Sequence, residues 1–501
     1  VPLICGSILL VELCERIAYY SITGTQESFL ERYGYSLTEA SALTATMGTL
    51  GMLWALLSGW LADVCLGRYR SIIVFAVIYI LGCCTLAIAA WPSHSSTGLY
   101  LFGVMVLVPL GTAGIKANIS NFGADQFDIS QPGQEEAQEQ FFSWFYIAIN
   151  LGAGVAYGCL TTLGSNGGLG LSLEHGYFAV YAIAAACMVG ALVAFIGGSA
   201  AYRVQALQPR SSAVAVIEAL AHSCVRGAGG AWAVSGGLFL LLYAVVLSVI
   251  ESFLPHGHPW QQSCTLVAFM TSGLGTFLVT YPCLRPSWMS AAALSPTHHE
   301  GTSAADVRNF LRLLPVLFSG NLAFNALYNS MQYWYQQQAC QMDLRPWTTS
   351  GAQFAGSFFL VADCLAILAA TPLALRFINP QVEKFCGDFG HGAKFGLGML
   401  CASLSVVVAS RLELQRAASP LLPQFSQCAP DGVRMSDLNA AWMLIPYFLM
   451  GVGEIYTQPV LMHLAYIVSP PSLRALSMAA SLVVGAVSTS LFTAQVSASS
   501  A

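Results

Sequence analysis

Charged residues are scarce in this sequence. Asp, Glu, Lys and Arg make up 9% of the 501 residues, against about a quarter in ordinary soluble domains. The chain has three lysines in all, Lys116, Lys384 and Lys394, and its net charge of −5 is spread thinly. This composition excludes an ordinary soluble domain, and it provides no basic surface for a nucleic-acid partner.

A cysteine or histidine framework is missing as well. The 15 cysteines show no spacing typical of secreted disulfide-rich domains, and most lie in apolar runs, where a free thiol packs as a small hydrophobe. The histidines in segments 256–258 and 298–299 have no cysteines or carboxylates around them that would complete a metal site. We expect no metal and no cofactor, and without a Ser/His/Asp set we expect no enzyme.

Long apolar stretches make up most of the chain. Hydrophobic residues account for 56% of it, and its mean hydropathy is +0.65. The stretches repeat at about 20 residues, the length that a helix needs to cross a bilayer. The pattern predicts an all-α integral membrane protein with helices at residues 3–29, 38–62, 71–91, 98–121, 140–163, 177–200, 308–337, 349–373, 393–411, 438–467 and 473–496.

Six predicted helices precede a long connection, and five follow it. This arrangement predicts two six-helix bundles, at residues 1–202 and 308–501, the second truncated before its last helix. The linker at 203–307 holds two more apolar runs, 231–254 and 264–284. Two alternatives stay open for these runs: an extra pair of membrane helices, or a hairpin on the membrane surface.

Basic residues are concentrated in alternate loops between the predicted helices. Because positively charged loops stay on the cytoplasmic side, this bias places the N-terminus in the cytoplasm. The stretch 411–437 carries three arginines on the opposite side and departs from the rule. The residues that set the orientation are Arg68, Arg70, Arg203, Arg210, Arg376, Lys384, Lys394 and Arg474.

The string "ELCERIAYY" places charges inside the first apolar stretch. Glu12, Glu15, Arg16, Tyr19 and Tyr20 follow one another at helical spacing and so share one helix face. Charged groups within a membrane helix usually mark a transport pathway or a paired site. A structural Glu–Arg pair that reaches water near the helix end is the simpler alternative, but three charges and two tyrosines on one stripe favour function.

A further buried charge, Lys116, lies in "GTAGIKANISNFGADQF". With Glu12 and Glu15 ionised, Arg16 and Lys116 bring the cluster to zero net charge. Protonation of one glutamate leaves a surplus positive charge that can hold a substrate carboxylate, which is the chemistry of a proton-coupled carrier.

These segments resemble a known family. "ELCERIAYY" is similar to the ExxERxxYY motif of the proton-coupled oligopeptide transporters (POT/PTR) of the major facilitator superfamily. The segments "SGWLADVCLGRYRSI", "GTAGIKANISNFGADQF", "FFSWFYIAINLGAG" and "GEIYTQPVLMHLAYIVSP" resemble four more signatures of that family. The context of Asp363 in "FFLVADCLAILAATPL" resembles the peptide/histidine-transporter branch.

The resemblance implies a proton-coupled symporter of di- and tripeptides that works by alternating access between two bundles, with histidine as a further candidate substrate. Its partners would be a small peptide or amino acid, protons and the lipid bilayer, with a monomeric protein in a plasma, endolysosomal or vacuolar membrane. The proton gradient would supply the energy. The implied proton-coupling residues are Glu12, Glu15, Arg16 and Lys116, and the implied substrate-binding residues are Arg16, Tyr19, Tyr20, Lys116, Asn150 and Glu454.

Two further sets of residues have structural or gating interpretations. Asp63 can pair with Arg68 or a helix end at the cytoplasmic face, and we assign both to gating rather than to substrate binding. Gly111, Gly114 and Gly123 are interpreted as packing glycines between close helices rather than as a phosphate site.

The chain also departs from the family. Relatives place an acidic residue or a glutamine in helix seven, where this chain has Ser330, and a glutamate after the helix-ten motif, where it has His463. Proton coupling would then depend on Glu12 and Glu15, with His463 the other candidate, although a packed neutral imidazole is the simpler interpretation. The alternative functions are a transporter of nitrate or another small anion or metabolite, and a transport-inactive nutrient sensor.

The orientation can be tested with inserted tags. Tags after Arg70 and Arg376 should be cytoplasmic and a tag at Ser95 external, because the basic loops stay inside. Protease or antibody access in sealed cells measures the side. Finding Ser95 and Arg70 on the same side would overturn the helix assignment, and a single crossing within 231–284 would reverse the second bundle.

Overall fold

The computed structural model describes most of the chain. The described residues are 4–469 without 95, 129–130, 169, 205–211, 255–257, 290–302, 347–351, 388 and 430–432, together with scattered positions between 473 and 491. The helix predicted at 473–496 therefore falls largely outside the described residues.

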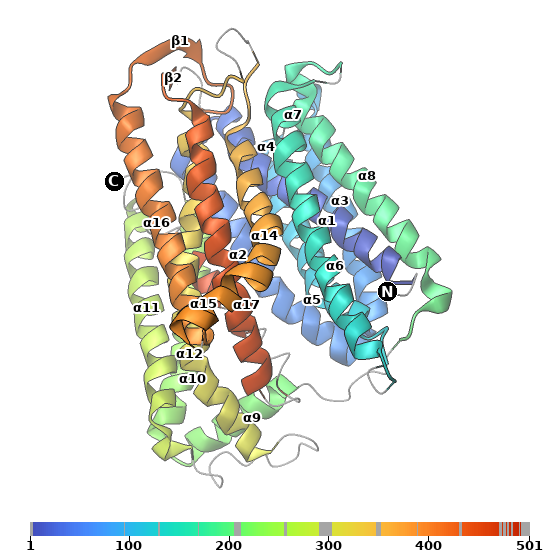
Figure 1. The fold of residues 1–501 in the computed structure, drawn as a ribbon, viewed down its shortest axis with the longest axis vertical. Helices are drawn as coiled ribbons and strands as arrows, with labels where there is room; N and C mark the ends of the chain where they lie inside the picture. Colours follow the sequence, from blue (N-terminus) through green and yellow to red (C-terminus); the bar gives the residue numbers. More distant parts are fainter. Residues whose placement is uncertain are drawn as a thin grey trace.

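The first part of the chain forms one bundle of helices, blue to teal in Figure 1. Helix α1 packs against α2, α5, α6 and α8, and α3 packs between α5 and α8. Two of the predicted helices, 98–121 and 140–163, contain a π-helical turn, η3 and η4 respectively. Each of these predicted helices therefore corresponds to two α-helices joined in line. The elements are α1 Ile4–Arg32, α2 Leu37–Leu61, η1 Ala62–Leu66, α3 Arg68–Ala89, η2 Pro92–His94, α4 Thr97–Phe102, η3 Gly103–Leu107, α5 Val108–Ala124, α6 Gln134–Val155, η4 Ala156–Leu160, α7 Thr161–Asn166, η5 Leu173–His175, α8 Gly176–Gly197 and η6 Ser199–Ala201.

Local sequence signals set several helix boundaries. A capping box begins α2, because the Ser36 side chain accepts from the Glu39 N–H and the Glu39 side chain accepts from the Ser36 N–H. A turn at Gly67, whose φ of 78° suits glycine, ends η1 and starts α3. A second capping box, Ser303 with Asp306, begins α12.

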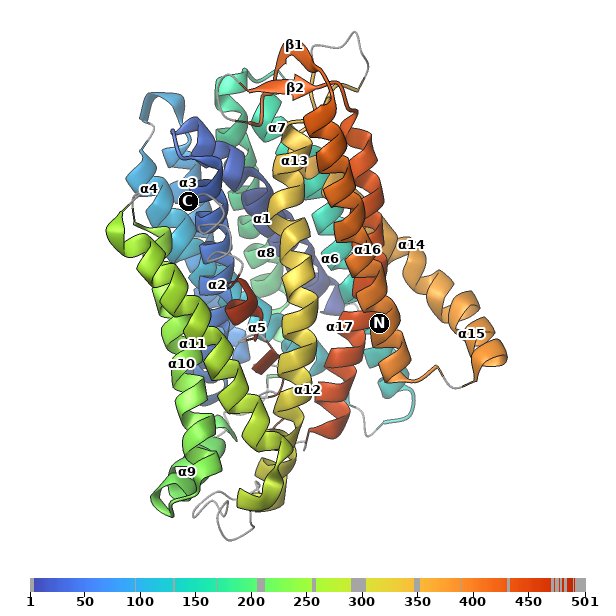
Figure 2. The same ribbon diagram turned by 90° about the vertical axis from the view of Figure 1, so that its left-hand side faces the viewer.

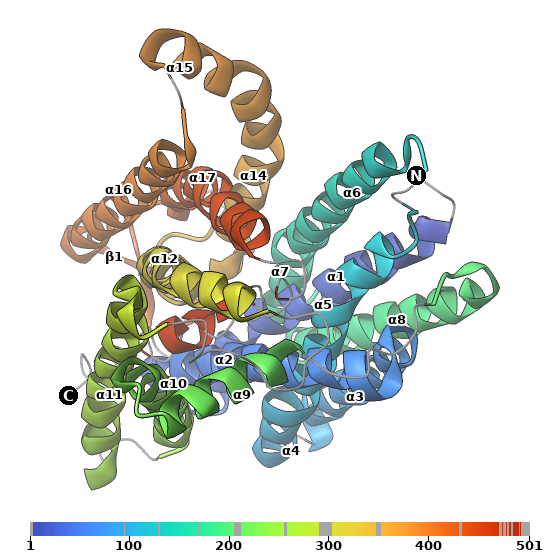
Figure 3. The same cartoon turned by 90° about the horizontal axis from the view of Figure 1, so that it is seen from below.

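The linker contains three helices and a short 3₁₀ turn, η7 Pro286–Trp288. These helices are α9 Ser212–Val225, which the sequence did not predict, α10 Gly229–Ser252 and α11 Pro259–Leu284. Figures 2 and 3 show α10 and α11 side by side at the edge of the molecule, where α10 packs on α2 and α11 on α12. The pair meets at Gly237 and Gly275, where a Cβ on either would come within 3 Å of the other's carbonyl oxygen.

Both linker helices are long and apolar enough to cross a membrane, and small residues at such a contact are typical of packed membrane helices. The structure thus favours the extra helical pair over the surface hairpin. Ten segments of the described chain meet this length and composition criterion, while α1 is not among them. Helix α1 is distinguished by its charges, which are Glu12, Glu15, Arg16, Glu27, Glu31 and Arg32.

The last part of the chain forms a second bundle, yellow to red in Figure 1. Helix α17 packs against α12, α14 and α16, while α15 extends away from the bundle in Figure 3. The elements are α12 Ala304–Asn329, η8 Ser330–Tyr335, α13 Gln336–Cys340, η9 Gly356–Leu360, α14 Val361–Leu373, η10 Ala374–Ile378, α15 Asn379–Cys386, α16 His391–Ala418, β1 Leu421–Phe425, β2 Arg434–Ser436, η11 Ala440–Met443 and α17 Leu444–Val468.

The prediction of a helix from residue 349 is wrong at its start, since residues 352–355 are not helical and η9 begins at Gly356. The backbone N–H groups of this segment form hydrogen bonds to other parts of the chain. The Phe354 N–H donates to the Leu344 carbonyl at 2.9 Å, and the Ala355 N–H donates to the Thr162 hydroxyl of the first bundle at 3.4 Å. These bonds replace the bonds of a first helical turn.

A short antiparallel hairpin, β1 with β2, covers one end of the second bundle, which we call the hairpin end. A disulfide joins Cys340, the last residue of α13, to Cys428 between the strands. The sequence did not predict this bond, since the partners are 88 residues apart and follow no local spacing. The arginines that departed from the charge rule lie in α16 and the hairpin, where Arg416 pairs with Glu413 at 2.5 Å.

The glycines of α5 have the packing role that the sequence predicted. A Cβ at Gly111 would lie 2.5 Å from the Tyr79 Cβ, one at Gly114 would lie 1.9 Å from the Phe75 Cγ, and one at Gly123 would lie 2.1 Å from the Phe141 ring. Helix α5 therefore approaches α3 and α6 more closely than any larger residue allows.

We predict that Gly114→Ala destabilises the fold by about 1–3 kcal/mol, because the added methyl overlaps the Phe75 side chain. Thermal unfolding of the purified protein in detergent measures the change. Gly154→Ala in α6 is the matched control, since a Cβ there meets nothing within 4 Å. Equal midpoints for the two variants would contradict the packing role.

Candidate functional site

The charged face of α1 is buried inside the first bundle. Glu12, Glu15 and Arg16 are 1%, 0% and 3% exposed. The Arg16 Nε lies 2.8 Å from the Glu12 Oε1 and 2.7 Å from the Glu15 Oε2, although its N–H does not point at either oxygen. One guanidinium thus contacts both carboxylates and balances one of their two negative charges.

Helices α5 and α6 complete this cluster. The Thr112 hydroxyl of α5 donates to the Glu15 Oε1, and Lys116, one turn further along α5, interacts electrostatically with Glu12, Glu15 and Arg16. On the other side, Gly152 of α6 allows close approach, because a Cβ there would lie 2.7 Å from the Arg16 Cβ. The structure therefore brings together the four residues that the sequence proposed for proton coupling.

Aromatic rings separate this cluster from the second bundle. The Arg16 Cζ lies 5.8 Å from the Tyr19 ring centroid and 6.0 Å from that of Tyr20, while the Lys116 Nζ lies 5.9 Å from the Tyr19 ring. Tyr20 interacts electrostatically with both Arg16 and Glu454. It therefore lies near charged groups of both bundles.

Glu454 faces these tyrosines from α17, and it has a carboxylate neighbour. Asp363 of α14 is 6% exposed and interacts electrostatically with Glu454. Gly451 allows the contact between the two helices, since a Cβ there would lie 2.9 Å from the Asp363 Oδ1. The Asp363 Oδ1 and Glu454 Oε2 are buried and have no hydrogen-bond partner among the described residues. The second bundle thus presents two carboxylates that no described cation neutralises.

The sequence context of Asp363 indicated a family branch only, and its pairing with Glu454 was not predicted. The signal was available in principle, because an isolated Asp within an apolar stretch is itself a functional candidate. Two more tyrosines, Tyr146 of α6 and Tyr328 of α12, interact electrostatically with both carboxylates. The two carboxylates and these two tyrosines come from four helices of the two bundles.

The remaining predicted residues lie around this centre. Asn150 of α6 is buried, and its side-chain amide donates to the Tyr146 carbonyl at 3.0 Å. Ser330 is half-buried at the first position of η8, so the π-helical turn begins where relatives place an acid or a glutamine. The side chain of His463 lies outside the described residues.

One of the two predicted gating residues can be placed. Arg68 donates to the Asp125 Oδ2 at 2.6 Å, which joins the start of α3 to the end of α5. The side chain of Asp63 lies outside the described residues, so its pairing with Arg68 stays a prediction. Asp125, in "FGADQF", is an acidic partner of Arg68 that the sequence did not indicate.

Outside the membrane-spanning helices, Asp343 fastens the segment after α13. Burial alone would raise the pKa of its carboxyl, but the hydrogen bonds and charge of Arg345 lower that pKa overall. The Arg345 Nε donates to the Asp343 Oδ1 at 2.8 Å. The backbone of Asp343 also bonds to Leu438 and Ala440, which ties this segment to the start of η11.

Comparison with solved structures identifies the fold. The chain is similar over 100% of its length to the POT family transporter PepTSo, with a TM-score of 0.78, 22% identity and 90% of that chain covered. It is similar over its whole length to an auto-inhibited POT family peptide transporter, with a TM-score of 0.75, 21% identity and 89% coverage. The fold is therefore that of the major facilitator transporters.

Comparison of sequences gives the same family. Two proteins of Arabidopsis thaliana, NRT1/PTR FAMILY 8.3 and 8.5, are 26% and 27% identical to this chain, each over 96% of it and over 80% and 78% of their own lengths. The model of the POT family matches residues 69–500. Because this match covers most of the sequence, the chain belongs to the POT family of multi-pass membrane transporters.

Proposed function

We propose that this protein is a proton-coupled symporter of di- and tripeptides, with histidine as a further substrate. The observation that carries this proposal is the different charge balance of the two bundles. The first bundle holds Arg16 and Lys116, whose positive charges are balanced by two glutamates until one of these takes up a proton. The second bundle holds Asp363 and Glu454 without a described cation. A zwitterion with a carboxylate and an ammonium group complements both.

The second bundle favours a cargo with an ammonium group over a bare anion. Nitrate beside Asp363 and Glu454 would face two carboxylates, whereas an ammonium group donates hydrogen bonds that the Asp363 Oδ1 and Glu454 Oε2 do not otherwise receive. Nitrate transport remains the second candidate, because two similar proteins carry both the nitrate and the peptide designation in their names.

Proton coupling is assigned to the cluster in the first bundle. Two carboxylates share one guanidinium, and Lys116 supplies the second positive charge. When one glutamate takes up a proton, the cluster gains a net positive charge, and a substrate carboxylate binds more tightly. Release of the proton reverses the change, so that substrate and proton leave on the same side.

Two independent features support an orientation with the N-terminus in the cytoplasm. The charge bias favours this side for the N-terminus, and α1 runs from there to the hairpin end. Disulfides persist on the oxidising side of membranes, so Cys340–Cys428 favours a hairpin end outside the cell or inside an organelle. Both features support the same orientation.

We predict that Lys116→Ala removes gradient-driven peptide uptake, with a loss on the order of tenfold or more, because the counter-charge that couples proton and substrate is lost. Uptake of labelled dipeptide into liposomes under an imposed pH gradient measures this. Exchange without a gradient should partly survive. Lys384→Ala, in the exposed helix α15, is the control and should transport normally. Normal gradient-driven uptake by Lys116→Ala would remove the coupling role of Lys116.

We predict that Glu454→Gln weakens binding of a free dipeptide by about tenfold or more, because a charge-assisted hydrogen bond to the ammonium is lost. Competition against labelled dipeptide measures the affinity. An N-acetylated dipeptide has no ammonium group, so its weaker binding should not change in the variant. Glu413→Gln in α16 is the control. If both peptides weaken equally, Glu454 does not bind the ammonium; if nitrate and not dipeptide is transported, the anion function replaces the proposal.

A further inference from the structure

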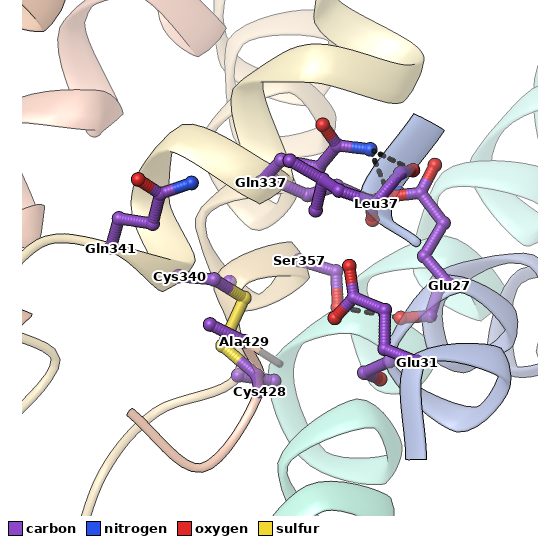
Figure 4. A pocket seen from close by; sticks show the side chains of 14 residues that line it. Glu27, Glu31, Leu37, Gln337, Cys340, Gln341, Ser357, Cys428 and Ala429 are labelled. Atoms are coloured by element: carbon purple, nitrogen blue, oxygen red, sulfur yellow. Dashed lines mark hydrogen bonds between the residues drawn. A yellow bond between two sulfur atoms is a disulfide. The ribbon is translucent and has the colours of Figure 1, made fainter. Parts of the chain in front are cut away.

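A small pocket lies between the two bundles at the hairpin end, away from the site described above. Glu27 and Glu31 of α1 form one side, and Gln337 of α13, Ser357 of η9 and the Cys340–Cys428 disulfide form the other. Figure 4 shows the two glutamates directed toward these groups from the first bundle. The function proposed above makes no use of this pocket.

Hydrogen bonds across the pocket join the bundles. The Gln337 amide donates to the Ser41 hydroxyl of α2, and more weakly to the Leu37 carbonyl at 3.4 Å and the Glu27 Oε2 at 3.5 Å. The Ser41 hydroxyl in turn donates to the Glu27 Oε1 at 3.2 Å. The Ser357 hydroxyl donates to the Gly24 carbonyl at 2.9 Å. These contacts close the hairpin end and have to break before it opens.

The disulfide and its neighbouring bonds hold the second-bundle side of this contact in place. Gln337 lies one helical turn before Cys340, which is bonded to Cys428. The Gln341 carbonyl accepts from the Ser436 N–H at 3.0 Å. Helix α13 is thus fixed to the hairpin, and Gln337 is presented to α1 and α2 from a rigid support.

The two glutamates are buried, and no cation among the described residues neutralises them. Glu27 is 5% exposed and Glu31 is 8% exposed. Glu31 makes no hydrogen bond or ion pair with the described residues, while its carboxylate lines the pocket. The charged group that acts on Glu27 is Glu31. Two ionised carboxylates in such a place repel each other and lose their hydration, so the closed arrangement favours the neutral acids.

The neighbouring elements do not supply a counter-charge. Arg32 is turned away, with its guanidinium donating to the Ser165 carbonyl at 3.2 Å and lying 4.9 Å from the Tyr177 ring. From α2 the group facing Glu27 is the neutral Ser41, while Glu39 is bonded to Ser36. Helix α13 and η9 contribute neutral amides and the Ser357 hydroxyl.

We propose that Glu27 and Glu31 form a second proton-binding site, whose occupation by protons holds the hairpin end closed. Protons bind more tightly to the closed arrangement, in which both carboxylates are buried, than to an open one, in which water hydrates them. By linkage, acid favours closure and alkali favours opening. In the proposed orientation these protons come from outside, so that loading from that side permits closure behind the substrate.

The experiment measures the width of the hairpin end without any cargo. Spin labels are attached through a non-natural amino acid at Leu171 of the first bundle and Leu421 of β1, both exposed, so that every native cysteine stays. The full chain is placed in nanodiscs, where both faces meet the same pH, and the distance between the labels is recorded from about pH 5 to about pH 8. The result is independent of orientation and of substrate.

The short-distance population of the wild-type chain should fall as the pH rises. In the double variant Glu27→Gln, Glu31→Gln it should stay high at every pH, because the amides resemble the neutral acids in shape and keep acceptors for Ser41 and Gln337. Glu174→Gln, on an exposed turn of the first bundle, is the matched control and should behave like the wild type. Gln337→Ala should lower the short-distance population at every pH.

Three results would overturn the proposal. The first is a double variant that opens with pH as the wild type does, and the second is a wild type without pH dependence. The third is a change of the distances by sodium or calcium at fixed pH where protons cause none. The last result would make the pocket a metal-cation site. Peptide uptake measured in parallel separates the two proposals, since a chain that fails to transport peptide can still show the pH-dependent distance change.

Discussion

The cost of burying charge away from water constrains this structure more than any other interaction. An ionised group inside a membrane protein has to be paired, hydrated or neutralised by a proton. The first bundle meets this demand by pairing, with Arg16 between Glu12 and Glu15 and with Lys116 nearby. Helices α5 and α6 have to approach α1 closely to exclude lipid from these groups, and Gly152 makes the approach to Arg16 possible.

The second bundle and the hairpin end meet the same demand in another way. Asp363 with Glu454, and Glu27 with Glu31, are pairs of like charge without a described counter-ion. In the two proposals above, a cation from the substrate or protons supply the missing positive charge. Where a carboxylate is paired with a cation inside the protein, removal of one partner leaves an unpaired buried charge, which commonly costs about 3–5 kcal/mol.

The contact between the bundles and the packing inside the first bundle depend on different interactions. At the hairpin end, a disulfide and backbone bonds fix α13, and the contact with the first bundle consists of a few hydrogen bonds from amide and hydroxyl groups. Such bonds each contribute about 0.5–1.5 kcal/mol, so they can break and re-form within a transport cycle. By contrast, the packing of α3 on α5 depends on glycines and aromatic rings and is suited to staying intact.

Composition and spacing alone determined the fold class, most helix positions and the α1 charge cluster, because apolar length and helical period are local properties. The packing role of Gly111, Gly114 and Gly123 also followed from the sequence. Pairings between distant segments did not: Cys340 with Cys428, Arg68 with Asp125, Asp363 with Glu454, and Gln337 with Ser41 each join residues from different helices or loops. Only the tertiary structure decided these, since sequence spacing specifies which residues share a helix face and not which helix lies opposite.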